Sequence, residues 1–196
     1  ALMALDNGKI DAFPTDESLY YAMRWEGKNY SIVEEPMATS TYGMIFGKGA
    51  NQDLRAELNA FLSDNKETVA VLEAKWFSEK EPTEFMSYDD LTGESGTLRI
   101  GVCSSVKPFV YMKDGKLTGY DIEILISFAR EYGYKLDFED TLFASVLTGV
   151  SMGTYDIGAS GFCITEERAE NVDFSDVYHT ENLVALIKGT DVGLEQ

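Results

Sequence analysis

The sequence predicts an α/β fold in which helices flank a mostly parallel sheet, with part of a second such unit beside it. Two observations carry this prediction. Residues 97–139 run strand, helix, strand, which is the order of a βαβ unit. In addition, a helix that ends at a glycine and leads at once into a short strand occurs twice, at residues 4–16 and 149–161. That step is typical of alternating α/β folds.

The first half of the chain is predicted to begin with the end of a helix and then to alternate short strands and helices. The strands are KIDAFP (9–14), NYSIVEE (29–35) and TYGMIFGKG (41–49). The helices are DESLYYAMRWEG (16–27), NQDLRAELNAFLSDN (51–65) and KETVAVLEAKWF (66–77). Residues 78–96 are charged, contain glycines and lack periodic apolar residues, which indicates a linker.

The second half repeats the alternation more clearly. Strands are predicted at TLRIGVCS (97–104), YKLDFE (134–139) and YDIGAS (155–160), with a turn at MKDGKLTG (112–119). Helices are predicted at YDIEILISFAREYG (120–133) and FASVLTGVSMG (143–153), the first because Ile122, Leu125, Ile126 and Ala129 share one face. GFCITEER (161–168) then opens a turn or a short helix.

Composition excludes several classes of protein. With 44% hydrophobic residues the chain can bury a core, and with 34 Asp and Glu against 16 Lys and Arg it repels nucleic-acid phosphates. No apolar run reaches the length of a membrane helix, and no signal peptide is visible. The chain starts as if inside a helix, so we expect a segment of a longer protein, and the missing signal indicates nothing about location.

The few cysteines and histidines exclude a zinc site and a cysteine framework. Cys103 and Cys163 lie 60 residues apart, and we expect two half-buried small residues rather than a disulfide. His179 is the one histidine, and a structural role is expected for it. No Ser-His-Asp or Cys-His arrangement is supported, so we predict a protein that is not an enzyme and has no cofactor or metal.

The order of motifs resembles a known family. TLRIGV, PFVYMKDGKLTGYDIEI and GVSMGTYDIGASGFCITEERAENVDFSDVY follow each other as in the amino-terminal lobe of bacterial extracytoplasmic amino-acid-binding proteins, the receptors that feed ABC transporters. The resemblance covers nearly all of residues 97–189, and ITEER followed five residues later by FSDVY is its most specific part. It implies a periplasmic-binding-protein-like lobe of the Venus-flytrap type.

Residues 4–77 are similar to the other end of the same family. ALDNGKIDAFPTD resembles the closing part of the second lobe, YGMIFGKG the returning hinge strand, and the helices ending in KWF the carboxy-terminal helices that pack on the first lobe. The order is end before beginning, which predicts a junction of two tandem modules rather than a circular permutation, since the strands that open the second lobe are missing. The predicted domains are 1–49 (second-lobe end and hinge strand), 50–77 (carboxy-terminal helices), 78–96 (linker) and 97–196 (first lobe of the next module).

The resemblance also implies partners and a location. The partners are a small amino acid and either an ABC transporter permease or a fused signalling domain, and the location is periplasmic or at the cell surface, with a membrane-anchored parent as one option. The carboxy-terminal helices could pack on the first lobe of the same chain, or two chains could exchange segments to form a homodimer, because missing strands leave sheet edges uncovered.

A pocket for a free amino acid needs a cation for the carboxylate and an anion for the ammonium group. Arg168 can bind a carboxylate bidentately, and the small residues of GFCIT can add backbone N–H donors. By resemblance, Arg168 and Thr165 match the family's carboxylate clamp, with Ser160, Gly161 and Cys163 lining it. Thr165 can also cap the helix that starts at TEER. The alternative makes Arg168 a surface residue paired with a neighbouring glutamate.

Two further positions follow from the resemblance. Phe143 stands where the family places an aromatic ring against the ligand side chain, and a core phenylalanine is the alternative. Asp16 matches the acidic partner of the ammonium group, and the alternative is an N-cap with Glu17 in the first helical turn. Asp16 and Arg168 belong to different predicted modules, so they need not share one pocket.

The chain departs from the family at Val106, where many relatives carry an aromatic residue, and at Cys103, where they carry an acid. These departures keep a ligand-free module open, so three function classes are considered. The favoured one is a binding module that closes on a small amino acid. The others are a ligand-free spacer in a sensor, and an enzyme like the cyclohexadienyl dehydratases of this fold, which would need a general acid in the cleft.

Overall fold

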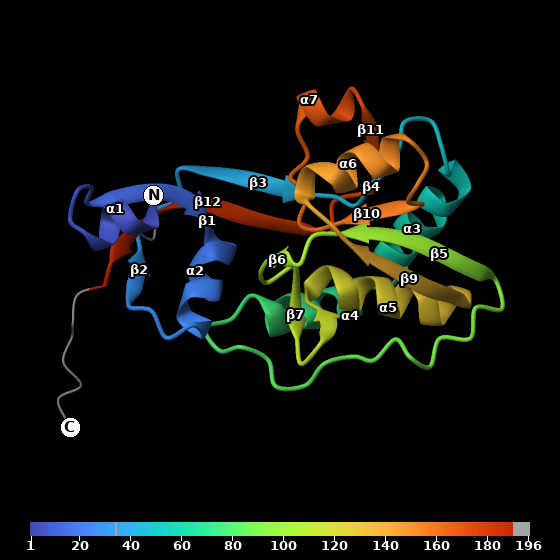
Figure 1. The fold of residues 1–196 in the computed structure, drawn as a ribbon, viewed down its shortest axis with the longest axis horizontal. Helices are drawn as coiled ribbons and strands as arrows, with labels where there is room; N and C mark the ends of the chain where they lie inside the picture. Colours follow the sequence, from blue (N-terminus) through green and yellow to red (C-terminus); the bar gives the residue numbers. More distant parts are fainter. Residues whose placement is uncertain (34, 190–196) are drawn as a thin grey trace.

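The structure, a computed structural model, describes residues 1–33 and 35–189, and this part contains both helices and strands along its whole length (Figure 1). The helices are α1 (Leu2–Asp6), α2 (Glu17–Trp25), α3 (Gln52–Asp64), α4 (Lys66–Trp76), α5 (Tyr120–Tyr132), α6 (Phe143–Ser151) and α7 (Glu166–Ala169). The strands are β1 (Ala12–Asp16), β2 (Tyr30–Ile32), β3 (Ala38–Tyr42), β4 (Ile45–Gly47), β5 (Gly96–Val102), β6 (Ser105–Val106), β7 (Val110–Lys113), β8 (Lys116–Thr118), β9 (Tyr134–Asp140), β10 (Ile157–Ala159), β11 (Val172–Phe174) and β12 (His179–Lys188).

A five-stranded sheet in the order β11-β4-β10-β5-β9 forms the main body. Strands β9 and β10 run parallel to β5, whereas β4 runs antiparallel to both β10 and β11. Successive residues of β4 point to opposite faces. Ile45 joins the apolar cluster under α6, and Phe46 joins the larger cluster under α3, α4 and α5, both with no exposed surface. The predicted α/β class is thereby confirmed.

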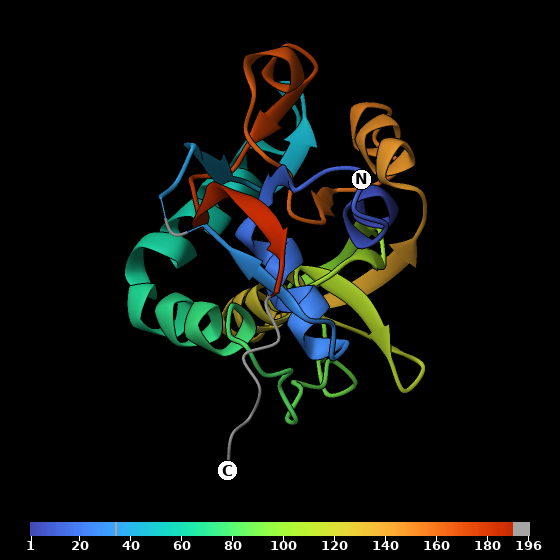
Figure 2. The same ribbon diagram turned by 90° about the vertical axis from the view of Figure 1, so that its left-hand side faces the viewer.

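A second, smaller sheet lies beside the first one. It has the order β1-β12-β2, with β3 also pairing with β12, and all of these pairs are antiparallel. Its core gathers Leu5, Ala22, Tyr30 and Leu186 under α1 and α2. Figure 2 shows the molecule from the end that carries these helices. The predicted partial second unit is therefore an antiparallel sheet with two short helices.

The predicted strand at residues 41–49 is in fact divided between the two sheets. β3 ends at Tyr42 in the small sheet, and β4 begins at Ile45 in the large one. Gly43 lies at the crossing, where a Cβ atom would come within 3.2 Å of the side chains of Ile164 and Phe174. Close packing at the crossing, which no local pattern encodes, separates the two strands.

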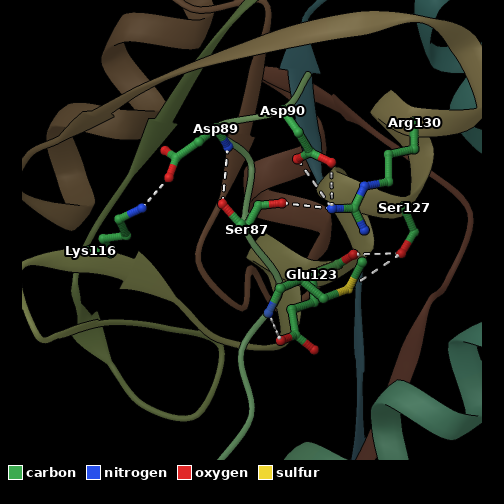
Figure 3. Close-up of polar contacts among 8 residues, drawn as sticks. Ser87, Asp89, Asp90, Lys116, Glu123, Ser127 and Arg130 are labelled. Atoms are coloured by element: carbon green, nitrogen blue, oxygen red, sulfur yellow. Dashed lines mark hydrogen bonds and ion pairs between the residues drawn. The ribbon is translucent and has the colours of Figure 1, made fainter. Parts of the chain in front are cut away.

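Residues 78–95 contain no helix or strand, and we call this segment the strap. It runs from the end of α4 along α5 to the start of β5 (Figure 1). Figure 3 shows how it is held: the Met86 amide donates to Glu123 of α5 at 2.9 Å, and Arg130 donates to the Ser87 carbonyl at 2.9 Å. Within the described residues, no helix is long and apolar enough to cross a membrane.

Candidate functional site

Most of the predicted site residues gather at one edge of the large sheet. The parallel strands β5, β9 and β10 end there, at Val102, Asp140 and Ala159. In open α/β sheets this edge is the usual place for a ligand. A hollow of about 340 Å³ lies at this edge and is lined by residues 103–105 and 140–142.

Hydrogen bonds to buried groups hold the segment after β10 in place. Ser160 is fully buried, and its hydroxyl accepts a hydrogen bond from the Cys103 amide at 2.7 Å and donates to the Ala159 carbonyl. The Gly161 amide donates to Asp121 at 2.8 Å. Ser160 and Gly161 therefore hold the loop in shape, and neither offers a free donor to the hollow.

Asp121, which accepts one of these hydrogen bonds, is not predicted as a site residue from the sequence. Its carboxylate accepts hydrogen bonds from Gly161 and from the Tyr178 hydroxyl, the latter at 2.7 Å. Burial raises the pKa of Asp121 to about 7, although both hydrogen bonds act in the opposite direction. An acid in the first turn of a predicted helix reads as a solvated helix start, so only its complete burial reveals this role.

Arg168 lies over the ring of Phe143, with its guanidinium carbon 5.6 Å from the ring centroid. Its Nη1 donates to the Cys163 carbonyl at 2.8 Å, and no ion pair joins it to Glu166 or Glu167 among the described residues. Phe143 in turn stacks on Phe162 at 4.4 Å. The predicted arginine and aromatic residue are thus neighbours, and Arg168 is fixed by a carbonyl and a ring rather than by a neighbouring carboxylate.

Thr165 and Cys163 complete this group. Thr165 is the N-cap of α7, because its hydroxyl accepts a hydrogen bond from the Arg168 amide at 3.2 Å. The predicted cap is confirmed. Cys163 forms an isolated bridge with Tyr42, and its own amide makes none of the hydrogen bonds found in the described part of the chain. This amide is therefore free to donate to a ligand oxygen.

Asp16 lies in the small sheet, at the end of β1 and the start of α2. It occupies the N-cap position, yet its side chain makes no capping hydrogen bond. Instead, Glu181 of β12 accepts from the Ser18 amide at 2.8 Å. Asp16 has no hydrogen bond or ion pair with Arg168 among the described residues, so the structure does not join the two charged groups directly.

Glu181 is the second acid of this region, and no pattern in the sequence selects it. Burial, helped by the nearby charge of Asp16, raises its pKa to about 7, although the hydrogen bonds from Ser18 act in the opposite direction. The Tyr42 hydroxyl is also buried beside Glu181, and burial raises the pKa of Tyr42 well above its ordinary value. Because Tyr42 also bridges to Cys163, it lies between the acidic pair and the Arg168 group.

The two cysteines and the histidine named in the sequence analysis take part in packing or in local contacts. Cys103 and Cys163 are both free, which agrees with the prediction that they form no disulfide. His179 starts β12, stacks on Phe77 at 4.0 Å and lies 2.7 Å from Glu73, and burial lowers its pKa. The part of the chain that the structure describes contains no group of three or more His, Cys, Asp or Glu residues able to hold a metal ion.

Comparison with known proteins finds similarity in the second half of the chain. Residues 98–192 match the model of the bacterial extracellular solute-binding proteins, family 3. The arginine-binding extracellular protein ArtP of Bacillus subtilis is 35% identical over 104 residues, which are 52% of this chain and 40% of ArtP. The chain thus matches about two fifths of that relative's length.

Two solved structures show similar local identity. An ancestral arginine-binding protein bound to glutamine is 38% identical, with a TM-score of 0.40, and the match covers 41% of this chain and 36% of that one. An ancestral cyclohexadienyl dehydratase is 34% identical, with a TM-score of 0.42, and the match covers 49% of this chain and 41% of that one. The segment at residues 98–192 is therefore similar to the bacterial extracellular solute-binding proteins of family 3.

Proposed function

We propose that this chain binds a small amino acid outside the cytoplasm, as part of a transporter receptor or of a sensor ectodomain. Two findings support the proposal: the family of residues 98–192 consists of extracellular solute-binding proteins, and the similar protein ArtP is named as arginine-binding. The proposed location is periplasmic or at the cell surface, and a membrane-anchored parent is part of the proposal.

The arrangement around Arg168 carries the proposal. Its guanidinium has five N–H groups, of which one is bound to the Cys163 carbonyl, so donors remain for a ligand carboxylate. The Cys163 amide and the capping Thr165 stand next to it. Phe143, under the guanidinium and stacked on Phe162, adds apolar surface beside this point. A carboxylate bound at this point would accept from a charged fork and a backbone amide together.

We assign the ammonium group of the ligand to Asp16. This aspartate has no capping hydrogen bond to lose, and the second acid Glu181 lies close enough to raise the local negative potential. Because Asp16 ends β1 of the small sheet and Arg168 lies on α7 beside β11 of the large sheet, a ligand that pairs with both would draw the two sheets together. Binding would then be linked to closure.

The proposed organisation is the junction of two tandem modules, divided at residues 1–49, 50–77, 78–96 and 97–196. The packing of α4 against α5 supports the assignment of 50–77 to helices that cover a first lobe. The last predicted residues, 190–196, lie outside the described residues. An ABC transporter permease or a fused signalling domain is the proposed partner, and a homodimer by segment exchange is the proposed assembly.

We propose no catalytic activity. An elimination like that of a cyclohexadienyl dehydratase needs a general acid in the cleft. His179 is buried against Phe77 and Glu73 and lines neither the hollow at residues 103–105 nor the Arg168 group. This placement supports binding over catalysis.

The test is a thermal-shift and calorimetry screen of the twenty common amino acids with the wild-type chain, Arg168→Ala and the matched control Arg99→Ala. Arg99, in the middle of β5, forms an ion pair with Asp156 at 2.7 Å and is not part of the Arg168 group. We expect one ligand to raise the melting temperature of wild type and Arg99→Ala, and Arg168→Ala to lose at least about tenfold in affinity. Equal affinity of all three proteins would contradict the proposal.

A ligand-free spacer is the second candidate, and Val106 and Cys103 favour it. Val106 offers no aromatic face to a ligand, and Cys103 places a thiol, 3.1 Å from the Ser105 hydroxyl, where many relatives carry an acid. In this case none of the amino acids shifts the melting temperature of this chain or of the longer parent protein. A shift in the longer protein alone would instead restore the binding proposal.

A further inference from the structure

A second cavity lies on the strap side of the large unit, away from the hollow at residues 103–105. Its volume is about 340 Å³, which is near the lower end of ordinary small-molecule pockets. The strap forms one wall through Phe85 and Tyr88, and the β7–β8 hairpin forms the other. It shares no lining residue with that hollow or with the Arg168 group.

The apolar walls of this cavity are held by rings outside it. Phe85 packs on Trp76 at 6.0 Å, and Tyr88 packs edge-on against Phe138 at 5.2 Å. Leu117, which lines the cavity from β8, is 8% exposed. These contacts fix the strap in place, so an apolar group could enter the cavity without first ordering its walls.

A buried polar group inside the cavity lacks a partner. Thr118 lines it and is 4% exposed, and its hydroxyl has no hydrogen-bond partner among the described residues. Buried hydroxyl groups in native proteins are nearly always hydrogen-bonded. The unpaired hydroxyl therefore points to a polar atom of a ligand.

Two lysines lie across the hairpin from each other at the same cavity. Lys113 and Lys116 are direct partners in the β7–β8 register, so their side chains share one face. Thr118 is on this face too, two residues along the strand. Like charges directly opposite each other in a sheet repel, and an anion between them removes that repulsion.

The lysines are paired at present with the strap, but only weakly. Lys113 binds Glu81, and Lys116 binds Asp89 (Figure 3), with lysine side-chain exposures of 38% and 58%. Such exposed ion pairs contribute little, so a ligand anion can replace them. Asp114, at the hairpin turn, is the single carboxylate of the hairpin at the cavity, against two lysines.

We propose that this cavity binds a small carboxylate with an apolar, preferably aromatic body. The body lies between Phe85, Tyr88 and Leu117. The carboxylate accepts hydrogen bonds from Lys113, Lys116 and the Thr118 hydroxyl. The site is independent of the amino-acid site proposed at Arg168, because it needs no ammonium group and no contact with the small sheet.

The experiment is calorimetric titration of the full chain with a matched pair of probes, 4-phenylbutyrate and 4-phenylbutylamine. They share one apolar body and differ in charge. We expect the carboxylate to bind and the amine to bind at least about tenfold more weakly, because two lysines would repel it. Equal binding of both probes, or no binding of either, overturns the proposal.

Four variants locate the site. Lys113→Gln and Lys116→Gln should each weaken 4-phenylbutyrate about fivefold, the amount expected for one partly exposed charge pair. Thr118→Val keeps the side-chain shape and should weaken it about threefold. Lys135→Gln, on β9 and outside the cavity, should leave it unchanged.

A last variant separates this site from the amino-acid site. Arg168→Ala should bind 4-phenylbutyrate as tightly as wild type does, whatever its effect on amino acids. Loss of probe binding in Arg168→Ala would place the carboxylate at Arg168 and would overturn the inference without touching the proposed function.

Discussion

Glu123 is the residue on which the strap depends. It is fully buried, and its carboxylate accepts from Lys75 at 2.7 Å, from the Trp76 indole at 3.0 Å and from the Met86 amide at 2.9 Å. A buried carboxylate is tolerated only when its oxygens are satisfied in this way. One side chain thus joins α4, α5 and the strap.

We predict that Glu123→Ala lowers the free energy of unfolding by about 3–5 kcal/mol, because it leaves the Lys75 ammonium and two N–H donors without their acceptor. The matched control is Glu131→Ala on the exposed part of the same helix, which should change it by at most about 0.5 kcal/mol. Urea unfolding measures both. Similar losses in the two variants would refute the idea that Glu123 anchors the strap.

Glu181 makes the stability of the protein depend on pH. Its pKa is about 7 in the folded chain, above the ordinary glutamate value of 4.5, so the folded state holds a proton that the unfolded state has released between these two values. Stability from this group therefore falls as pH rises from about 4.5 to 7.

We predict that Glu181→Gln, which mimics the protonated acid, is more stable than wild type at pH 8 by up to about 3 kcal/mol and gains far less at pH 4.5. For Glu67→Gln, at an exposed residue in the first turn of α4, the difference in stability from wild type should be the same at every pH. Urea midpoints across this range measure the difference. A constant gap between Glu181→Gln and wild type would contradict a raised pKa as its cause.

The site residues show what a single sequence reveals about side chains. The family resemblance predicts Arg168, Thr165 and Phe143 as site residues, and they lie together: Arg168 and Thr165 share one local turn, and Phe143 reaches Arg168 from the start of α6. Asp121 and Glu181 escape prediction because their burial depends on segments far along the chain: Gly161 for Asp121, and Ser18 for Glu181. When the partners of a residue are distant in sequence, the residues next to it in the chain do not indicate its role.

At the scale of elements, β4 is the strand that local sequence patterns predict least well. It is three residues long and comes from the first half of the chain, yet it lies between β10 and β11 of the second half. By contrast, the helix predicted at 120–133 is confirmed as Tyr120–Tyr132, since its apolar face is periodic. Sequence patterns specify helices with such a face, whereas strand partners depend on long-range pairing.

The importance of β4 is open to a direct test. Phe46→Ala should lower the free energy of unfolding by about 3–5 kcal/mol, because Phe46 is fully buried in the main core. Val71→Ala, at a residue that is 68% exposed, should cost at most about 0.5 kcal/mol. Chemical unfolding of the two variants decides: a small loss at Phe46 would mean that β4 contributes little to the large sheet.

At the scale of the whole molecule, the two sheets differ in how well they are covered. The large sheet is covered by helices on both faces, whereas the small sheet has the short strand β2 at its edge. We predict that backbone amides of Tyr30–Ile32 exchange with deuterium faster than those of Ile157–Ala159, since edge strands open without global unfolding. Exchange followed by mass spectrometry checks this order. Equal protection would indicate that both sheets unfold as one unit.

The paired strands β3 and β12 have a mechanical consequence. They run side by side over Ala38–Tyr42 and His179–Leu183 and carry the chain from one sheet to the other. Sliding one strand along the other would break every backbone hydrogen bond between them. Bending the two-stranded ribbon out of its plane would keep these hydrogen bonds. We therefore expect the two sheets to move relative to each other mainly by bending of this ribbon, and we expect the hydrogen bond from the Trp25 indole to the Ser78 carbonyl, at 2.8 Å, to oppose that movement.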